Sequence, residues 1–280
     1  MHKRLTDLLT HQGLPTQPAQ DLLRLLEPVQ PLEYSVHSHR VGVGAMVNGD
    51  GLEHCARVLR VMAHFGFGGL GRARAWMNRF EGRRVFLKVD LGPQGPKELS
   101  LYFRRRTPVE TVLQWLNQDG LDREGLLCIA QTAQILGCPK VHFVAQSWEL
   151  DSGALETEAG HGASEHKLYF AQPPGRPGWQ RTLSWLPTRS VPKATIARLQ
   201  ELELQDAQRF ASIRLGPEGL KDGAKLDIAE PSPELVGLLS ATDAPGQGRL
   251  HSLMQSGPID YLGWDVTAGA QGVGLYSTRR

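Results

Sequence analysis

The stretch RVFLKVDLGPQGPKELSLYFRR, residues 84–105, contains two runs in which apolar and polar side chains largely alternate. Between the two runs lies PQGPK, residues 93–97, a segment of turn-forming residues. Alternation with a period of two is typical of a β-strand, and glycine and proline between two such runs indicate a hairpin. The stretch therefore predicts two antiparallel strands joined by a short turn.

Similar pairs of β-like runs recur along the chain at intervals of roughly 50–70 residues, which indicates an internal repeat. They cover residues 32–47, 141–172, 210–230 and 259–278. Helical patterns fill the gaps between the pairs, with apolar residues three and four positions apart. The predicted helices cover residues 5–12, 18–27, 52–65, 69–79, 108–117, 122–136, 191–206 and 232–240. Thr107 is the expected N-cap of one of them, with Pro108 at its first position.

The alternation of helices and hairpins favours one closed sheet, because closure removes the unpaired edges of ten twisted strands. The predicted fold is α+β: a closed ten-stranded antiparallel β-barrel of five ββαα units, surrounded by a ring of α-helices. Residues 1–280 are expected to form a single barrel domain, and two separate α+β domains are the structural alternative. An eight-stranded parallel α/β barrel does not fit, since the strands of this chain come in pairs.

Helices on the outside of a barrel require the apolar face of each strand to point outward, so alternate side chains point into the lumen. In ELSLYFRR the leucines and Phe103 point outward, which turns Tyr102 and Arg104 inward. The same reasoning turns Lys167 and Tyr169 inward. Applied to every hairpin, it predicts a lumen that contains Arg40, Lys88, Tyr102, Arg104, Lys167, Tyr169, Arg214, Lys225 and Tyr276.

A buried cluster of cations needs compensating negative charge, because an unpaired buried charge is costly. Internal carboxylates are one source, and Asp90 and Asp227 share inward faces with Lys88 and Lys225. A bound anion is the other source, and a diphosphate supplies both charge and acceptor oxygens. The remaining interpretation places these charges on the solvent face of ordinary antiparallel sheets.

The composition is globular, with 40% hydrophobic and 21% charged residues among 280. A formal net charge of +2 argues against a duplex-DNA binder. The first twenty residues lack the apolar core of a signal peptide, and no run of about 18 apolar residues predicts a membrane span. Cys55, Cys128 and Cys138 form no CxxC pair and are interpreted as reduced thiols. We therefore expect a cytoplasmic protein that binds neither nucleic acid nor membrane.

The chain resembles the aromatic prenyltransferases of the ABBA, or PT-barrel, architecture, whose fold also has five hairpin units. Its pattern is most similar to the cyanobactin-type peptide prenyltransferases, whose chains likewise end on the last barrel strand, here GVGLYSTRR. LEYSVHSHR resembles their first strand, and FLKVDLG with ELSLYFRRRTPVETVLQWLNQDGLD resembles their second hairpin and the following helix. Lys167 and Tyr169 are similar to a K-x-Y element of the wider fold.

The resemblance implies a role for each candidate residue. Glu33 matches the carboxylate that orients or deprotonates the acceptor. Arg40, Arg104 and Lys167 match family positions that contact the prenyl diphosphate. Tyr102, Tyr169 and Tyr276 match the residues that surround and shield the allylic group. Lys88 and Arg214 are expected to supply a cation that relatives often carry at the position of Gly274, and Lys225 completes the predicted prenyl-diphosphate site.

The resemblance also implies an activity. A dimethylallyl-like prenyl group would move from its diphosphate to a side chain of a ribosomal, cyclic peptide, as in RiPP biosynthesis, or to an aromatic small molecule. Mg²⁺ is expected to bind through the diphosphate, since the sequence contains no DDxxD motif and predicts no dedicated metal site. The alternatives are a catalytically inactive barrel that binds a peptide or small molecule, and an unrelated α+β enzyme or interaction protein.

Overall fold

The computed structural model describes residues 3–26, 32–37, 40–47, 51–81, 85–150, 164–202, 204, 207–216, 218–240, 259–266 and 271–279. The connections inside the first, third and fifth predicted hairpins, at residues 38–39, 151–163 and 267–270, lie outside these ranges. Within the described residues, every predicted hairpin is present as a pair of antiparallel strands.

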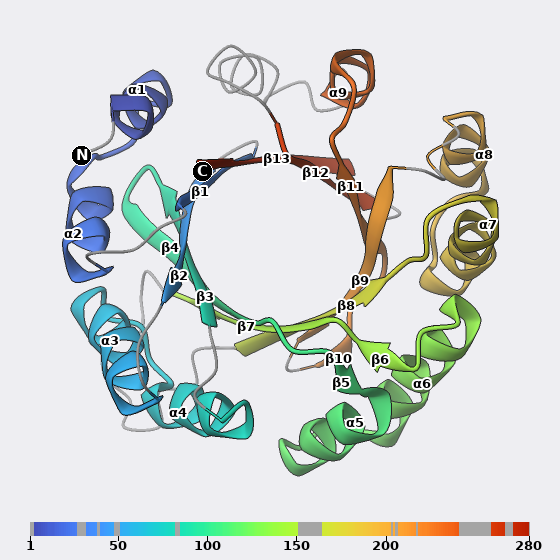
Figure 1. Cartoon of the computed structure of the whole chain (residues 1–280), viewed down its shortest axis with the longest axis horizontal. Helices are drawn as coiled ribbons and strands as arrows, with labels where there is room; N and C mark the ends of the chain where they lie inside the picture. Colours follow the sequence, from blue (N-terminus) through green and yellow to red (C-terminus); the bar gives the residue numbers. More distant parts are fainter. Residues whose placement is uncertain are drawn as a thin grey trace.

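The long strands form a closed antiparallel barrel (Figure 1). They are β1 (Leu32–His37), β2 (Arg40–Val47), β3 (Val85–Gly92), β4 (Gly95–Phe103), β7 (Phe143–Glu149), β8 (Ser164–Ala171), β9 (Gln208–Gly216), β11 (Ala224–Ala229), β12 (Tyr261–Val266) and β13 (Gln271–Arg279). Their order around the barrel is β9-β11-β12-β13-β1-β2-β3-β4-β7-β8, and pairing of β8 with β9 closes the ring. The ten-stranded barrel predicted from the hairpins is therefore confirmed.

Short strands lie outside this pattern. β10 (Gly219–Leu220) pairs with the end of β9, and β5 (Thr107–Pro108) pairs with β6 (Lys140–Val141) in a separate ladder. The β5 ladder contradicts the predicted helix cap at Thr107. The Thr107 hydroxyl donates to the carbonyl of Arg105, and Pro108 in extended conformation is the residue that precedes the helix. The Thr-Pro sequence therefore does not cap the helix here, because Thr107 pairs instead with Val141 of β6, which is distant in sequence.

Helices surround the barrel on its outside (Figure 1). They are α1 (Lys3–His11), α2 (Gln17–Leu26), α3 (Gly51–His64), α4 (Leu70–Arg79), α5 (Val109–Gln118), α6 (Arg123–Leu136), α7 (Arg176–Trp185), the 3₁₀ helix η1 (Leu186–Arg189), α8 (Lys193–Glu201) and α9 (Pro233–Ser240). The sequence patterns did not predict α7 and η1. Pro177 lies in the first turn of α7, where its missing N–H costs nothing.

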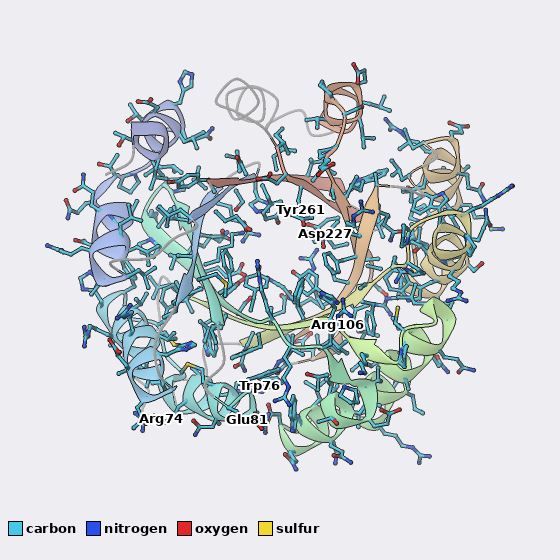
Figure 2. All side chains as sticks on the ribbon, viewed as in Figure 1. Arg74, Trp76, Glu81, Arg106, Asp227 and Tyr261 are labelled. Carbon is cyan, nitrogen blue, oxygen red and sulfur yellow. The ribbon has the colours of Figure 1, made fainter. Side chains whose placement is uncertain are left out.

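The outward faces of the strands pack against the helices. Leu99, Leu101 and Phe103 of β4 are buried, and the rings of Phe80 and Phe103 stack with centroids 4.5 Å apart. Trp76 of α4 lies between that helix and the barrel wall (Figure 2). Each fully buried side chain of this kind contributes roughly 1.5–3 kcal/mol. This packing fixes which face of every strand is left for the lumen.

Two further expectations from the sequence concern the cysteines and the apolar character of the helices. Cys55, Cys128 and Cys138 are free thiols. Among the described helices, none combines the length and the apolar character needed to span a bilayer.

Candidate active site

The barrel contains a cavity of about 370 Å³. Of the ten residues that the sequence predicted for the site, six line it: Glu33, Tyr102, Arg104, Tyr169, Lys225 and Tyr276. They come from β1, β8, β11 and β13, and from β4 with the residue after it. Residues separated by most of the chain thus meet in one space because the barrel closes.

Aromatic rings form much of the cavity wall. The rings of Tyr102 and Tyr169 lie 6.1 Å apart, and Phe86 meets Tyr102 edge to face at 5.7 Å. Burial raises the phenol pKa of both tyrosines above its usual value, so both stay neutral. Neutral aromatic faces carry negative potential, which suits a cation held between them.

The cavity is also lined by apolar and aromatic side chains that the sequence did not predict as site residues. They are Met46, Phe86, Phe143, Phe210, Ala229 and Tyr261. The alternation used for the cations also predicts several of them, since Met46 shares a face with Gly44 and Phe86 shares one with Lys88. The predicted site contained only charged residues and tyrosines, so it omitted the five of these residues that are neither, and it also omitted Tyr261.

Glu33 occupies the part of the wall formed by β1 and β2. It pairs in register with Gly44, whose missing side chain leaves room for the ring of Phe86. Burial raises the pKa of the Glu33 carboxyl, and the positive charges of Lys88 and Arg104 act against that rise. Within the described residues, the Glu33 carboxyl forms no side-chain hydrogen bond or ion pair, although the backbone of Glu33 pairs with both neighbouring strands. The carboxyl is therefore available to a ligand in the cavity.

Lys225 and Asp227 form the charged part of the opposite wall. The Lys225 ammonium lies 2.8 Å from Oδ1 of Asp227 and donates to the Tyr276 hydroxyl at 3.1 Å. It also lies 4.9 Å from the ring centroid of Tyr276 and 5.9 Å from that of Tyr169. Burial alone would lower the pKa of Lys225, but the charge of Asp227 holds it well above its usual value. Gly263 leaves the space in which the lysine stem runs.

Arg104 is the second cation of the cavity. Its guanidinium lies 5.0 Å from the ring centroid of Phe86 and 5.6 Å from that of Phe143. The residue itself is exposed, so this cation stands at the open side of the cavity. Such stacking orients an arginine without neutralising its charge.

The other four predicted cations do not line the cavity. Each of them is paired with a carboxylate: Arg40 with Glu98 and Asp90, Lys88 with Asp90, Lys167 with Glu98, and Arg214 with Asp265. Of the two sources of negative charge left open by the sequence, internal carboxylates thus serve these four residues. Distances within this network are 2.8 Å for Arg40 and Lys167 to Glu98 and 2.9 Å for Lys88 to Asp90.

His37 joins the paired network to the cavity. Its Nε2 lies 3.4 Å from the Lys88 ammonium, and its ring meets that of Tyr276 at 5.7 Å. Burial, together with the charges of Lys88 and Arg40, lowers the pKa of His37 well below its usual value. The imidazole is therefore neutral and accepts a hydrogen bond from Lys88.

Asp227, Glu230 and Asp260 line the cavity together with Glu33. The sequence placed Asp227 on an inward face as a possible counter-charge for Lys225, whereas it did not predict Glu230 and Asp260. Glu230 and Asp260 follow or precede strands, where alternation gives no guidance about direction. Among the residues that the structure describes, no group of three or more His, Cys, Asp or Glu side chains is arranged to hold a metal ion.

Comparison with known proteins rests on structure. No family model matches this sequence. No curated protein matches it. Among solved structures, AnaPT from Neosartorya fischeri matches with a TM-score of 0.62 and 13% sequence identity, over 98% of this chain and 90% of that one. The shared architecture is the PT-barrel, a closed ten-stranded antiparallel barrel surrounded by helices.

Proposed function

We propose that this PT-barrel protein transfers a prenyl group of the dimethylallyl type from its diphosphate to a peptide side chain or an aromatic small molecule. One observation carries the proposal: Tyr102, Tyr169 and Tyr276 surround the same cavity as two cations and the Glu33 carboxyl. AnaPT, whose fold the chain shares, is an aromatic prenyltransferase. The sequence resemblance to cyanobactin-type peptide prenyltransferases favours a peptide acceptor.

The first half of the proposed reaction breaks the bond between C1 of the prenyl group and the diphosphate oxygen. The bonding electrons leave with the diphosphate, and Lys225 and Arg104 are the cations within the cavity that stabilise its growing charge. The allylic cation that remains is held by the faces of Tyr102, Tyr169 and Tyr276, which also exclude water.

The second half forms a bond from the acceptor to C1 or C3 of the allylic cation. The acceptor then loses a proton, and Glu33 is the proposed proton acceptor. Its raised pKa brings its basicity closer to neutrality, which makes proton uptake more favourable than at an exposed glutamate. Diphosphate and the prenylated acceptor are the products, and one proton passes to the carboxyl.

In the proposed reaction, Mg²⁺ binds only together with the prenyl diphosphate. The described side chains supply no cluster suited to hold the ion, so the oxygens of the diphosphate are its proposed ligands. When bound there, Mg²⁺ would reduce the negative charge of the leaving group. No protein residue is assigned to it.

A second candidate function is binding without transfer, in a barrel of the same fold. The specific observation that favours it is the pairing of Arg40, Lys88, Lys167 and Arg214 with internal carboxylates. Cations already neutralised in this way have less charge to offer a diphosphate. The two candidates differ in whether any prenyl diphosphate binds and reacts.

The test combines binding and turnover. Thermal unfolding is measured with dimethylallyl or geranyl diphosphate, each with Mg²⁺, and with pyrophosphate as the control, since a ligand of the native state raises the transition temperature. Aromatic amino acids and a panel of cyclic peptides are then incubated with the donor, and products are detected by mass spectrometry. Donor binding with a prenylated product supports transfer. No stabilisation by any prenyl diphosphate, with or without an acceptor, eliminates transfer and favours the binding barrel.

A further inference from the structure

We propose that the acceptor is a peptide with acidic residues beside its acceptor residue, and that these acidic residues bind a basic surface next to the cavity. This surface, the basic ladder face, consists of Arg106, Pro108, Lys140 and His142. That the peptide is an acceptor rests on the proposed function, whereas its binding can be measured without any prenyl donor.

The short ladder of β5 and β6 presents the basic ladder face. Thr107 pairs with Val141, and Pro108 pairs with Lys140. Thr107 and Val141 are buried, whereas Arg106, Pro108 and Lys140 are exposed. Because neighbouring side chains of a strand point to opposite faces, the residues that flank the buried pair share the outer face. The fold thus gathers cations from two segments that are far apart in sequence onto one small surface.

Backbone hydrogen bonds fix this ladder against the barrel. The N–H of His142 donates to the carbonyl of Tyr169 at 2.7 Å, and the N–H of Val109 donates to the carbonyl of Pro139 at 3.1 Å. Tyr169 itself lines the cavity. Arg106 lies close to the barrel wall in Figure 2. The basic ladder face therefore has a fixed position beside the cavity.

The cations of the basic ladder face have no carboxylate partner in the part of the chain that the structure describes. The ladder and its flanks, residues 104–108 and 138–143, contain no Asp or Glu. No ion pair or hydrogen bond to another described residue engages the side chain of Arg106 or of Lys140. Their positive charge is therefore available to a ligand.

The nearest carboxylates in other elements serve other positions. Glu81 pairs with Arg105 at 3.4 Å. Glu230 and Asp260 lie at the ends of β11 and β12, and β7, β8 and β9 separate those ends from β4 around the barrel. A basic surface on this side is compatible with a diphosphate in the cavity, because the two attract ligands of the same sign.

The imidazole of His142 lies within the field of these cations. Burial lowers the pKa of His142 below its usual value, and the positive charges of Arg106 and Arg104 lower it further. The cations therefore lie close enough to the ring to act on it. A bound carboxylate would oppose their effect and raise the pKa of His142 again.

Aromatic rings connect the cavity with the basic ladder face. Phe143 and Phe210 line the cavity, and the ring of His142 lies 4.5 Å from the first and 5.1 Å from the second. An extended peptide covers roughly 10 Å in three residues, about the length of two such ring separations. A peptide whose aromatic side chain lies in the cavity therefore places residues within three positions of it on the basic ladder face.

The experiment compares three pentapeptides by isothermal titration calorimetry near pH 7 and at low salt. Each has a central tryptophan, flanked on both sides by two glutamates, two glutamines or two lysines. Several exposed charge contacts together should let the glutamate peptide bind about tenfold more tightly than the glutamine peptide, and the lysine peptide should bind most weakly. The preference should decrease at high salt.

Variants assign the preference to the basic ladder face. Arg106→Gln combined with Lys140→Gln is expected to remove the advantage of the glutamate peptide and to leave binding of the glutamine peptide within about twofold. Arg106→Glu combined with Lys140→Glu is expected to reverse the order of the glutamate and lysine peptides. Arg74→Gln is the matched control, since Arg74 is exposed on α4 in the outer layer of Figure 2. Near-UV circular dichroism verifies that each variant is folded.

Two further measurements locate the bound glutamates. The imidazole signal of His142, assigned with His142→Gln, is titrated by NMR, and the glutamate peptide should raise the pKa of His142 whereas the glutamine peptide should not. The calorimetry is also repeated with inorganic pyrophosphate at matched ionic strength, which occupies the cavity cations Lys225 and Arg104. The preference should persist there, because Arg106 and Lys140 do not line the cavity.

Equal affinities of the glutamate and glutamine peptides overturn the proposal. So do a preference that survives the Arg106 and Lys140 variants, a preference that pyrophosphate abolishes, and the absence of binding by all three peptides up to about 1 mM. A failure of prenyl transfer is seen separately, because the titrations contain no donor. A glutamate preference without a prenylated peptide supports the basic ladder face and counts against transfer, and prenylation with equal affinities does the reverse.

Discussion

Lys225 and Asp227, two positions apart on β11, form an ion pair of 2.8 Å whose members both line the cavity. Because strand residues two apart share a face, the hairpin sequence alone brings these two side chains to the same side of the sheet. Tyr276 on β13 completes the unit by accepting a hydrogen bond from the lysine. The proposed cation for the leaving diphosphate is thus already oriented before any ligand arrives.

Replacement of Lys225 tests this unit. Lys225→Met leaves the Asp227 carboxylate buried without its partner, so we expect unfolding free energy to fall by roughly 3–5 kcal/mol in urea titrations. In Lys225→Met combined with Asp227→Asn, most of that stability should return, because no buried charge remains. Donor-induced stabilisation should stay lost in the double variant. A double variant that still binds prenyl diphosphate would contradict the role of Lys225.

Glu33→Gln tests the proposed base. The substitution preserves size but removes the proton acceptor, and we expect transfer to slow by roughly 10²–10⁴-fold while donor binding is retained. The measurement is the initial rate of product formation by chromatography. An unchanged rate would show that the proton leaves by another route.

The pH dependence of the wild-type rate provides a second test of Glu33. The carboxyl acts as a base only when ionised, and burial raises its pKa above the ordinary 4.5. Activity should therefore decline as pH falls, with a midpoint above 4.5, and this decline should be absent from the residual activity of Glu33→Gln. A midpoint at or below 4.5 would contradict the proposed environment.

Glu98 is expected to be a stabilising centre of the paired network. It lies 2.8 Å from both Arg40 and Lys167. Burial acts to raise its pKa, but Lys167 and Arg40 outweigh burial and hold it well below the ordinary 4.5. Since the folded pKa is the lower one, this stabilisation is present above pH 4.5 and is lost as pH falls through the folded pKa. Glu98→Gln should lower stability near neutrality and flatten its decline in acid, as measured by denaturant titration at several pH values. An equally steep acid decline in the variant would assign the effect elsewhere.

Gly44→Ala tests the shape of the cavity wall. A β-carbon at this position would overlap the ring of Phe86, which must then shift at a cost of roughly 1–3 kcal/mol. We expect weaker ligand binding, by about tenfold, with the barrel still folded. The matched control is Gly71→Ala on α4, where a β-carbon meets no atom within 4 Å. That control should leave binding unchanged and raise stability by up to about 1 kcal/mol. Equal binding by both variants would show that Phe86 does not limit the cavity.

Local sequence patterns were sufficient to predict features that depend on residues a few positions apart, such as helices and the inward face of a strand. Asp122 caps α6 through the N–H of Gly125, and Gly137 in the left-handed conformation ends that helix, so both ends are set by residues within or next to the predicted range 122–136. Alternation also assigned Tyr102, Lys167 and Lys225 to the lumen. The same local reasoning failed at Thr107, where strand pairing across more than thirty residues replaced a helix cap.

The hairpins, their number and the inward face of each strand follow from the amino-acid sequence, because alternation and turn residues act over a few positions. Which inward residues meet depends on barrel closure and on the register between distant strands. Arg40 and Glu98 are 58 positions apart, and no local pattern distinguishes a cation paired there from Arg104, which faces the cavity. The division of the lumen into a neutralised ion-pair network and an acidic, aromatic cavity therefore emerges only when the chain is folded.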